Sequence, residues 1–313
     1  MVICELYQQD AESQWNEFVR ASKTPLFIFE RPFMDYHADR FNDFSLLFKE
    51  EDQLLAVLPA NIVNNVVYSH GGLTFGGLIL SHKVKAEKVI EILQTLKIFL
   101  KEKTVSRLEY KSIPYIFTTN PAQEDLYALS IVGATLFRRD ISSVIDMERE
   151  PKFSKGRKWL IARAKKNGLC VEESTDWSAY HALLSSVLSK HSATPTHSID
   201  EMALLHERFP ENIRLRVVRK DGELICGVLL FAYEQVLHTQ YIAANEVGRE
   251  SGALDLTLAS CIDEARRSDK AYFSFGISTE RGGLYLNTGL IAQKESFSAR
   301  AIVHDFYRLE LND

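Results

Sequence analysis

The sequence predicts an α+β protein built from two tandem units, each a mixed, mostly antiparallel sheet flanked by helices. The chain has 313 residues, about twice the length of a common domain. The order of strand-like and helical segments in the first half nearly recurs in the second. In both halves a strand leads through a glycine-containing loop into an amphipathic helix. No close sequence repeat accompanies this order, so the repeat is one of pattern only.

In the first half, strand signals are short apolar runs and helix signals are apolar residues three and four apart. Strands are expected at 2–7, 44–48, 54–63, 66–69 and 107–111, with extended segments at 134–140 and 141–147. Helices are expected at 11–21, 84–100 and 123–132. The segment HGGLTFGG at 70–77 contains four glycines, which permit sharp turns and close approach to a ligand. A glycine-rich crossover without a ligand is the alternative.

The second half repeats this order. Strands are expected at 169–173, 213–219, 224–233, 238–244, 271–276 and 301–311. Helices are expected at 177–189, 199–209 and 251–267. The turn KDGE between two of the strands predicts a hairpin. Ser198 and Glu201 have the spacing of a capping box at the start of the second helix.

A basic segment separates the two halves. Glu150 and Pro151 interrupt the pattern, and residues 152–166 then contain seven lysines and arginines and no acidic residue. We expect an N-terminal unit at 1–150, a basic linker helix at 151–168 and a C-terminal unit at 169–313. The helix either lines a groove for a phosphorylated ligand or presents a solvated positive face.

Composition limits the class of protein. The hydrophobic content of 46% and the charged content of 25% are ordinary for a soluble protein. A net charge of −5 provides no whole-molecule attraction to nucleic acid. The four cysteines form no CxxC pair, so we expect no metal site. The chain has no apolar run of membrane-spanning length and no signal-peptide pattern at its start, so a cytoplasmic location is expected.

The segment 238–267 carries the clearest functional signal. A strand opens through a loop with two glycines and one arginine into a helix. Backbone N–H groups and the positive end of the helix dipole then converge on one point, which favours an anion. An ordinary strand–loop–helix connection is the alternative, because no complete GxGxxG or GKS/T pattern is present.

The C-terminal half resembles the GNAT superfamily of acyl-CoA N-acyltransferases, in its FemAB-like, double-GNAT branch. The resemblance rests on YIAA at 241–244, FSFG at 273–276 and KESF at 294–297. The GNAT loop that binds the acyl-CoA pyrophosphate reads Q/R-x-x-G-x-G/A. Here Arg249 and Gly252 match its first part, and Leu254 stands at its last position. The resemblance implies an acyl-CoA co-substrate bound by Gly248, Arg249, Ser251, Gly252 and Ala253. FemAB-like proteins often use an aminoacyl-tRNA donor instead, which leaves a second donor open.

Direct acyl transfer to an amine requires a base, a donor to the developing oxyanion and aligned reactants. His197 and Glu295 are the candidate bases, and the Tyr241 hydroxyl is the candidate oxyanion donor. His238 begins the central strand and faces the gap where this fold places its substrate. The candidate substrate-binding residues are His70, Lys111, Tyr115, Gln240, Ser278, Asn287 and Lys294. Structural roles remain open for them: a helix-flanking His197, a core Tyr241 and a surface ion pair of Lys294 with Glu295.

The resemblance implies an N-acyltransferase with an acetyl- or acyl-CoA donor. Its acceptor would be an amine of a polar small molecule, such as an amino sugar or a cell-envelope precursor. One alternative is a FemABX-like peptidyl or aminoacyl transferase that depends on aminoacyl-tRNA, with the basic helix contacting RNA phosphates. Another is a non-catalytic ligand-binding protein of GNAT fold.

Overall fold

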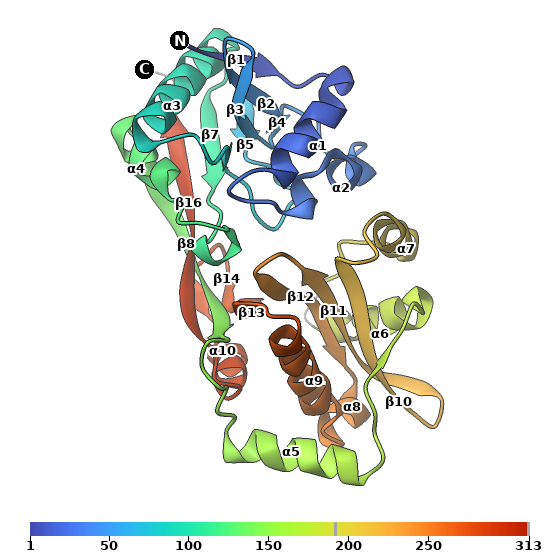
Figure 1. The fold of residues 1–313 in the computed structure, drawn as a ribbon. Helices are drawn as coiled ribbons and strands as arrows, with labels where there is room; N and C mark the ends of the chain where they lie inside the picture. The colour runs from blue at the N-terminus through green and yellow to red at the C-terminus, as the bar shows by residue number, and fades with distance from the viewer. Residues whose placement is uncertain (191–192, 312–313) are drawn as a thin grey trace. The chain divides into compact units, whose positions relative to one another are not determined.

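The computed structural model describes residues 1–190 and 193–311, and its contacts group into two units that are not contiguous in sequence. Unit 1 comprises Met1–Ile141, Arg281–Tyr285 and the chain from Val303 onward, and unit 2 comprises Ser142–Glu280 and Leu286–Ile302. Strand β8 (Thr135–Asp146) therefore begins in unit 1 and ends in unit 2, and β16 (Arg300–Glu310) does the reverse (Figure 1). The domain boundaries expected from sequence divide the chain into consecutive segments, and they stay a prediction.

Unit 1 contains a four-stranded sheet in the order β1-β2-β3-β6 and a second group of strands in the order β4-β5-β7-β16-β8. The strands are β1 (Val2–Leu6), β2 (Leu46–Glu50), β3 (Gln53–Leu58), β4 (Asn61–Val63), β5 (Val66–Tyr68), β6 (Ile79–Leu80) and β7 (Arg107–Lys111). The helices are α1 (Glu12–Arg20), α2 (Arg31–Met34), α3 (Ala86–Glu102) and α4 (Glu124–Ile131). The core lies against α3, which buries one face made of Val89, Ile92, Leu93, Leu96 and Leu100.

Unit 2 contains strands in the order β8-β13-β12-β11-β10-β9. The strands are β9 (Glu172–Glu173), β10 (Ile213–Lys220), β11 (Glu223–Ala232), β12 (Val236–Ala244) and β13 (Tyr272–Ile277), followed by the short β14 (Thr279–Glu280) and β15 (Tyr285–Leu286). The helices are α5 (Lys155–Lys166), α6 (Trp177–Ser189), α7 (Ile199–Arg208), α8 (Glu246–Glu250), α9 (Ala253–Arg267) and α10 (Thr288–Glu295).

Helices α6 and α9 pack on opposite faces of this sheet, as successive residues of β11 show. Cys226 lies in a core cluster with Leu256 of α9, and a side chain added at Gly227 would meet Tyr180 of α6. Successive residues of a strand point to opposite faces. Figure 1 shows α9 lying across β12 and β13.

The predicted α+β class with two units is confirmed, and most predicted elements are present. Several segments differ, among them the following three. The predicted strand at 54–63 is divided between β3 and β4, because Pro59 has no N–H to continue the ladder. The predicted segments at 134–140 and 141–147 form the single long strand β8. The loop after β12 contains the additional helix α8, capped by the Asn245 side chain.

A buried carboxyl in unit 1 provides a test of this fold. Asp125 accepts hydrogen bonds from the Tyr110 hydroxyl at 2.5 Å and from the Leu126 amide at 2.9 Å, and burial raises its pKa from 3.8 to about 6. The protonated carboxyl therefore stabilises the fold below about pH 4, and this contribution is lost as the pH rises through about 6. The free energy of unfolding of the parent should fall between pH 4.5 and pH 8. In urea unfolding, this fall should be about 1–3 kcal/mol smaller for Asp125→Asn. The exposed Asp52→Asn is the control, and parallel pH curves for the parent and Asp125→Asn would contradict the burial.

Candidate functional site

The site begins where β12 and β13 separate. These strands pair in parallel at three positions only, from Val236 with Tyr272 to His238 with Ser274. Both strands continue beyond that point, β12 to Ala244 and β13 to Ile277, without further pairing to each other. The backbone therefore leaves an opening in the sheet at the C-terminal ends of two adjacent strands.

A bulge in each strand accompanies the separation. In β12, Gln240 is the extra residue, because Leu229 pairs with Tyr241 while Leu230 pairs with Thr239. In β13, the pairing with β8 shifts between Ser274 and Ile277. Gly276 lies in this shift with a φ of +72°, a conformation that glycine adopts without strain. Bulges bend a strand and increase its twist, so they direct the two strands apart.

A cavity of about 260 Å³ occupies the opening. Most of its lining is apolar, and includes Val187, Ile242, Leu254, Leu258, Phe275 and Phe297. The polar side chains that line it are Arg249, Gln293 and Lys294. It is therefore an apolar pocket with two cationic side chains.

Lys294 is held inside the cavity by the end of β13. Its Nζ donates to the carbonyl oxygens of Gly276 at 3.0 Å and Ile277 at 2.7 Å, and its side chain is almost fully buried. Burial lowers the pKa of Lys294 from 10.5 to about 7. Within the described residues no acidic side chain pairs with it, so two backbone dipoles alone stabilise its charge.

His238 lies where pairing ends, beneath Gly276. Its Nδ1 shares a hydrogen bond of 3.0 Å with Ser274 Oγ, and its ring carbon Cε1 lies 3.4 Å from where a Gly276 Cβ would be. Burial, and then the charge of Lys294, lower the pKa of His238 to about 3. His238 is thus a neutral support of the bend in β13 at physiological pH.

His197 and Tyr241 are brought together, 44 residues apart in sequence. His197 Nδ1 and the Tyr241 hydroxyl share a hydrogen bond of 2.9 Å, and their rings meet edge to face at 5.8 Å. The Tyr180 hydroxyl donates to the Tyr241 carbonyl at 3.2 Å and holds this part of β12 against α6. Burial raises the pKa of the Tyr241 hydroxyl, which keeps it protonated and able to donate.

The other predicted residues of unit 2 are distributed around the strand ends. Glu295 is exposed on α10, and no described contact joins it to His197 or Tyr241. Asn287 caps α10 by accepting from the Leu290 amide at 2.9 Å, so it has a structural role. Gln240 Oε1 and Ser278 Oγ are buried polar atoms without a hydrogen-bond partner among the described residues. Such atoms are rare in folded proteins, and a polar ligand group would satisfy them.

The predicted anion loop satisfies most of its own N–H groups. The amide of Gly248 donates to Asn245 Oδ1 at 2.8 Å, Arg249 to the Asn245 carbonyl at 3.1 Å, and Ser251 to the Val247 carbonyl at 2.9 Å. Gly252 donates to the Arg249 carbonyl at 3.3 Å, and Ala253 is fully buried. The Arg249 side chain donates to the Ala244 carbonyl at 2.6 Å. The five predicted cofactor-binding residues therefore fit a diphosphate poorly.

The basic helix α5 packs against the start of α9, next to this loop. Arg157 forms an ion pair of 2.7 Å with the buried Asp255 in the first turn of α9 and donates to Ser296 Oγ at 2.7 Å. A Cβ on Gly252 would lie 2.4 Å from the carbonyl oxygen of Leu160 in α5. The start of α9, where an anion would bind, is thus already packed against another helix and supplied with a carboxylate.

Residues 153–281, which include the cavity's two strands, match the family model described as "Acetyltransferase (GNAT) domain". This chain carries a GNAT acyltransferase domain. Comparison with curated protein sequences finds no significant match. The family assignment therefore rests on the segment that contains β10–β13 and α9.

Solved structures show the same fold over the whole chain. The structure of FemX has a TM-score of 0.69 at 10% identity and covers 99% of this chain and 97% of FemX. L-PGS from Bacillus licheniformis has a TM-score of 0.65 at 10% identity, with 99% and 94% covered. A tandem GNAT protein from the clavulanic acid biosynthesis pathway has a TM-score of 0.57 at 10% identity, with 100% and 99% covered. At these identities the likeness establishes the tandem GNAT fold alone.

Unit 1 has the same parallel pair as the GNAT domain but fills it with its own chain. Strands β5 and β7 also pair at three positions, ending at Tyr68 with Glu109. Beyond them, the Lys111 amide donates to Ser69 Oγ at 2.6 Å and the Leu78 amide to the Tyr110 hydroxyl at 2.7 Å. A Cβ on Gly76 would lie 1.9 Å from the Ser69 carbonyl oxygen, so the glycines at 70–77 permit close packing of the chain on itself.

Of the three predicted ligand-binding residues of unit 1, two are in contact with each other and the third is exposed. Lys111 donates through Nζ to the carbonyls of His70, at 3.3 Å, and Leu73, and burial lowers its pKa to about 8. His70 is buried, and burial lowers its pKa to about 3. Tyr115 is exposed. Their substrate-binding role stays a prediction, and the structure shows a packing role for Lys111.

Sequence reasoning did not identify the apolar lining of the cavity or the role of α5. Leu258 and Phe275 have the pattern of core residues, and only the separation of the strands makes them a pocket wall. Asp255 is the sequence feature that could have revealed the role of α5, because a carboxylate on the buried face of a helix requires a cationic partner.

In the described residues, no helix is long and apolar enough to cross a membrane, and no three His, Cys, Asp or Glu side chains group as a metal site.

The contact between α5 and the start of α9 can be tested with two glycines of equal conformation. Gly252 has a φ of +81° and faces Leu160, whereas Gly222 has a φ of +82° and no atom within 4 Å of an added Cβ. Alanine at either position adds strain of about 1 kcal/mol, and at Gly252 it also forces α5 away. Urea unfolding should show Gly252→Ala to be about 1–3 kcal/mol more destabilising than Gly222→Ala. Equal losses would show that α5 does not pack there.

Proposed function

We propose that the protein is an N-acyltransferase whose acyl donor enters the cavity between β12 and β13. The acceptor is an amine of a polar small molecule, such as an amino sugar or a cell-envelope precursor. The cavity of about 260 Å³ at the separation of these strands carries the proposal, because Lys294 lies inside it and Tyr241, which bonds His197, belongs to the strand β12 that lines it. The GNAT domain match over residues 153–281 supports the reaction class.

In the proposed reaction, the acceptor amine attacks the donor carbonyl, so that a C–N bond forms and the bond to the leaving group breaks. Tyr241 donates its proton to the departing group, and His197 returns a proton to Tyr241 through their shared hydrogen bond of 2.9 Å. The amine gives the proton that it loses to the other ring nitrogen of His197, so that His197 and Tyr241 end the reaction with as many protons as they began. Tyr241 suits the role because burial raises its pKa and keeps its hydroxyl protonated.

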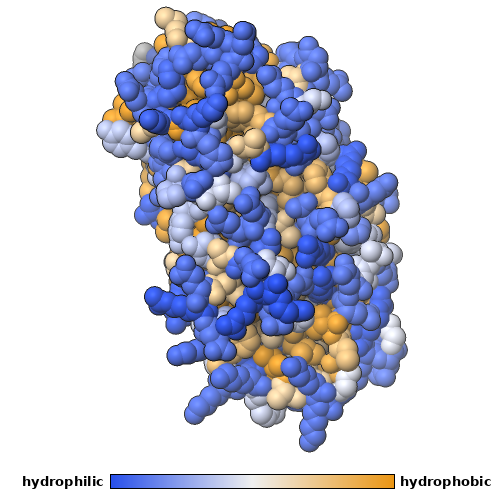
Figure 2. All heavy atoms as spheres, in the orientation of Figure 1, coloured by the Kyte–Doolittle hydropathy of each residue, from blue (hydrophilic) through white to orange (hydrophobic). Residues whose placement is uncertain are grey.

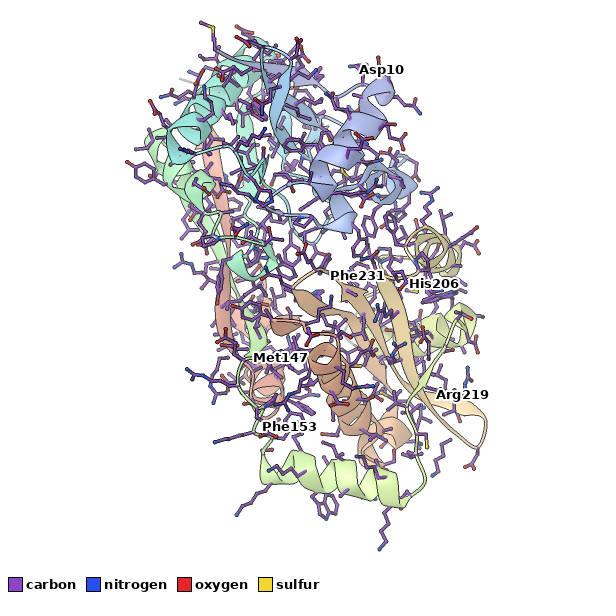
Figure 3. The ribbon with its side chains drawn as sticks, in the orientation of Figure 1. Asp10, Met147, Phe153, His206, Arg219 and Phe231 are labelled. Atoms are coloured by element: carbon purple, nitrogen blue, oxygen red, sulfur yellow. The ribbon has the colours of Figure 1, made fainter. Side chains whose placement is uncertain are left out.

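Two substitutions test this pair. Tyr241→Phe removes the donated proton and His197→Gln removes the relay, so each should lower kcat by about 10²–10⁴-fold with a small change in KM. His206→Gln is the matched control, because His206 (Figure 3) is a histidine of the same unit that bonds the Ile213 carbonyl at 2.8 Å. Unchanged turnover in both variants would show that the pair is structural.

The second candidate is an aminoacyl transferase that takes its donor from aminoacyl-tRNA, as the FemAB-like resemblance implies. The loop geometry favours it, because the amides of Gly248, Arg249, Ser251 and Gly252 are already bonded and the start of α9 is covered by α5. A donor without a diphosphate at that position does not need them.

The charge on α5 also favours this candidate. Arg157 is engaged with Asp255, and the other six cations at 152–166 are exposed without an acidic partner among the described residues. Trp159 is 60% exposed among them, and Arg163 lies over its ring at 5.4 Å. Hydrophilic side chains project from α5 at the lower end of Figure 2. The rest of the chain has 30 cations against 42 acidic residues, so this helix concentrates positive charge.

A binding comparison distinguishes the donors. We expect tRNA to bind with a steep salt dependence, and the triple change Lys158→Gln, Arg163→Gln and Lys166→Gln to make the slope of log K against log salt shallower by about 2. The exposed lysines of unit 1 provide the control triple, Lys83→Gln, Lys85→Gln and Lys103→Gln. Calorimetric binding of acetyl-CoA that Arg249→Ala weakens, without tRNA binding, would overturn the second candidate. If neither donor supports turnover, the result would instead favour a non-catalytic binding protein.

A further inference from the structure

The cavity of the proposed donor site has an unusual charge balance. Its polar lining consists of Lys294, Arg249 and the amide of Gln293, and no acidic residue lines it among those described. Of the acidic residues adjacent in sequence to a lining residue, Asp255 is paired with Arg157 at 2.7 Å, and Glu250 and Glu295 are exposed. A cation in this cavity would therefore lack a counterion and meet two like charges.

The shape of the cavity sets the size of its ligand. An apolar cavity of about 150 Å³ binds benzene, so about 260 Å³ accepts a larger group such as an aliphatic chain of about eight carbons. Leu290 of α10 also lines it and is 37% exposed, which places this leucine at the mouth. Phe297 at the inner wall is fixed edge to face by Phe153 (Figure 3), with ring centroids 5.3 Å apart. The inner end is therefore rigid.

Lys294 provides a donor for one polar group at the inner end. An ammonium has three N–H donors, and the Gly276 and Ile277 carbonyls take two of them. The third remains for the cavity that Lys294 lines. An anionic or carbonyl oxygen on the ligand would complete this set, whereas an ammonium would be repelled.

We propose that this cavity binds a neutral or anionic apolar group of the donor and excludes cationic ones. The inference rests on the proposed function, and it specifies the chemical class of the transferred or carrier group. A fatty-acyl or aromatic group fits, and so does the neutral arm of a carrier. A lysyl side chain does not fit, and the α-amino group of an aminoacyl donor must lie outside the cavity.

Three probes of equal chain length test the charge preference on the intact protein: octanoate, 1-octanol and octylammonium. By calorimetry at pH 6, octanoate should bind at least about tenfold more tightly than octanol, and octylammonium should bind most weakly. Octylammonium binding as tightly as octanoate would overturn the proposal. Binding of none of the three would also overturn it.

Two substitutions locate the binding. Lys294→Met should weaken octanoate about tenfold and leave octanol within about threefold. Because this change leaves two carbonyls without their donor and can destabilise the fold, Leu290→Trp provides a second test by obstructing the mouth, and should weaken both probes. Leu284→Trp is its control, because Leu284 is 91% exposed and does not line the cavity. Equal effects of the two tryptophans would place the probe elsewhere.

The pH dependence separates an ion pair with Lys294 from apolar burial alone. The pKa of Lys294 is about 7, so octanoate should lose about tenfold in affinity between pH 6 and pH 9, whereas octanol should not. Arg249 also lines the cavity, and His238, with a pKa of about 3, stays neutral over this range. A flat octanoate profile would contradict the role of Lys294. Charge-selective binding without acyl transfer would refute the proposed function and leave only the charge preference of the cavity standing.

Discussion

The limit of three paired positions between β12 and β13 is the constraint on which unit 2 depends. Where two strands no longer pair with each other, their backbone N–H and C=O groups need other hydrogen-bond partners. At the end of β13 the partner is Lys294, which donates to the Gly276 and Ile277 carbonyls. An opening in a sheet is thus maintained by a buried ammonium. The same side chain closes the strand end and gives the cavity its charge.

The two units contain the same kind of parallel strand pair, but they differ in what occupies the space beyond it. In unit 1 the chain after β5 returns into the space, where Ser69, Tyr110 and Lys111 hold it with side-chain and backbone hydrogen bonds. In unit 2 the loop after β12 folds into α8 and leaves the space to a cavity. A shared topology therefore supports a packed unit and an open one, and the difference arises from the loop that follows the central strand.

The sequence predicts the fold well because its signals are local. Helices α3 and α9 follow from apolar periodicity, and the hairpin of β10 and β11 follows from KDGE. The candidate site is less predictable, since it depends on strand register. The bulge at Gln240, the contact of Gly252 with Leu160 and the meeting of His197 with Tyr241 arise from pairings that no short window of sequence encodes. A glycine motif has the same sequence whether its backbone approaches a ligand or a neighbouring helix.

The placement of β16 has a consequence for the order in which this protein can mature. Unit 1 needs β16 beside β7, where Phe306 pairs with Lys111 and Glu310 with Arg107. Strands β9–β13 of unit 2 lie between β7 and β16 in the chain. During synthesis, β7 therefore lacks its neighbour β16 until these strands of unit 2 have been made. Unit 1 is thus begun before unit 2 and completed after it.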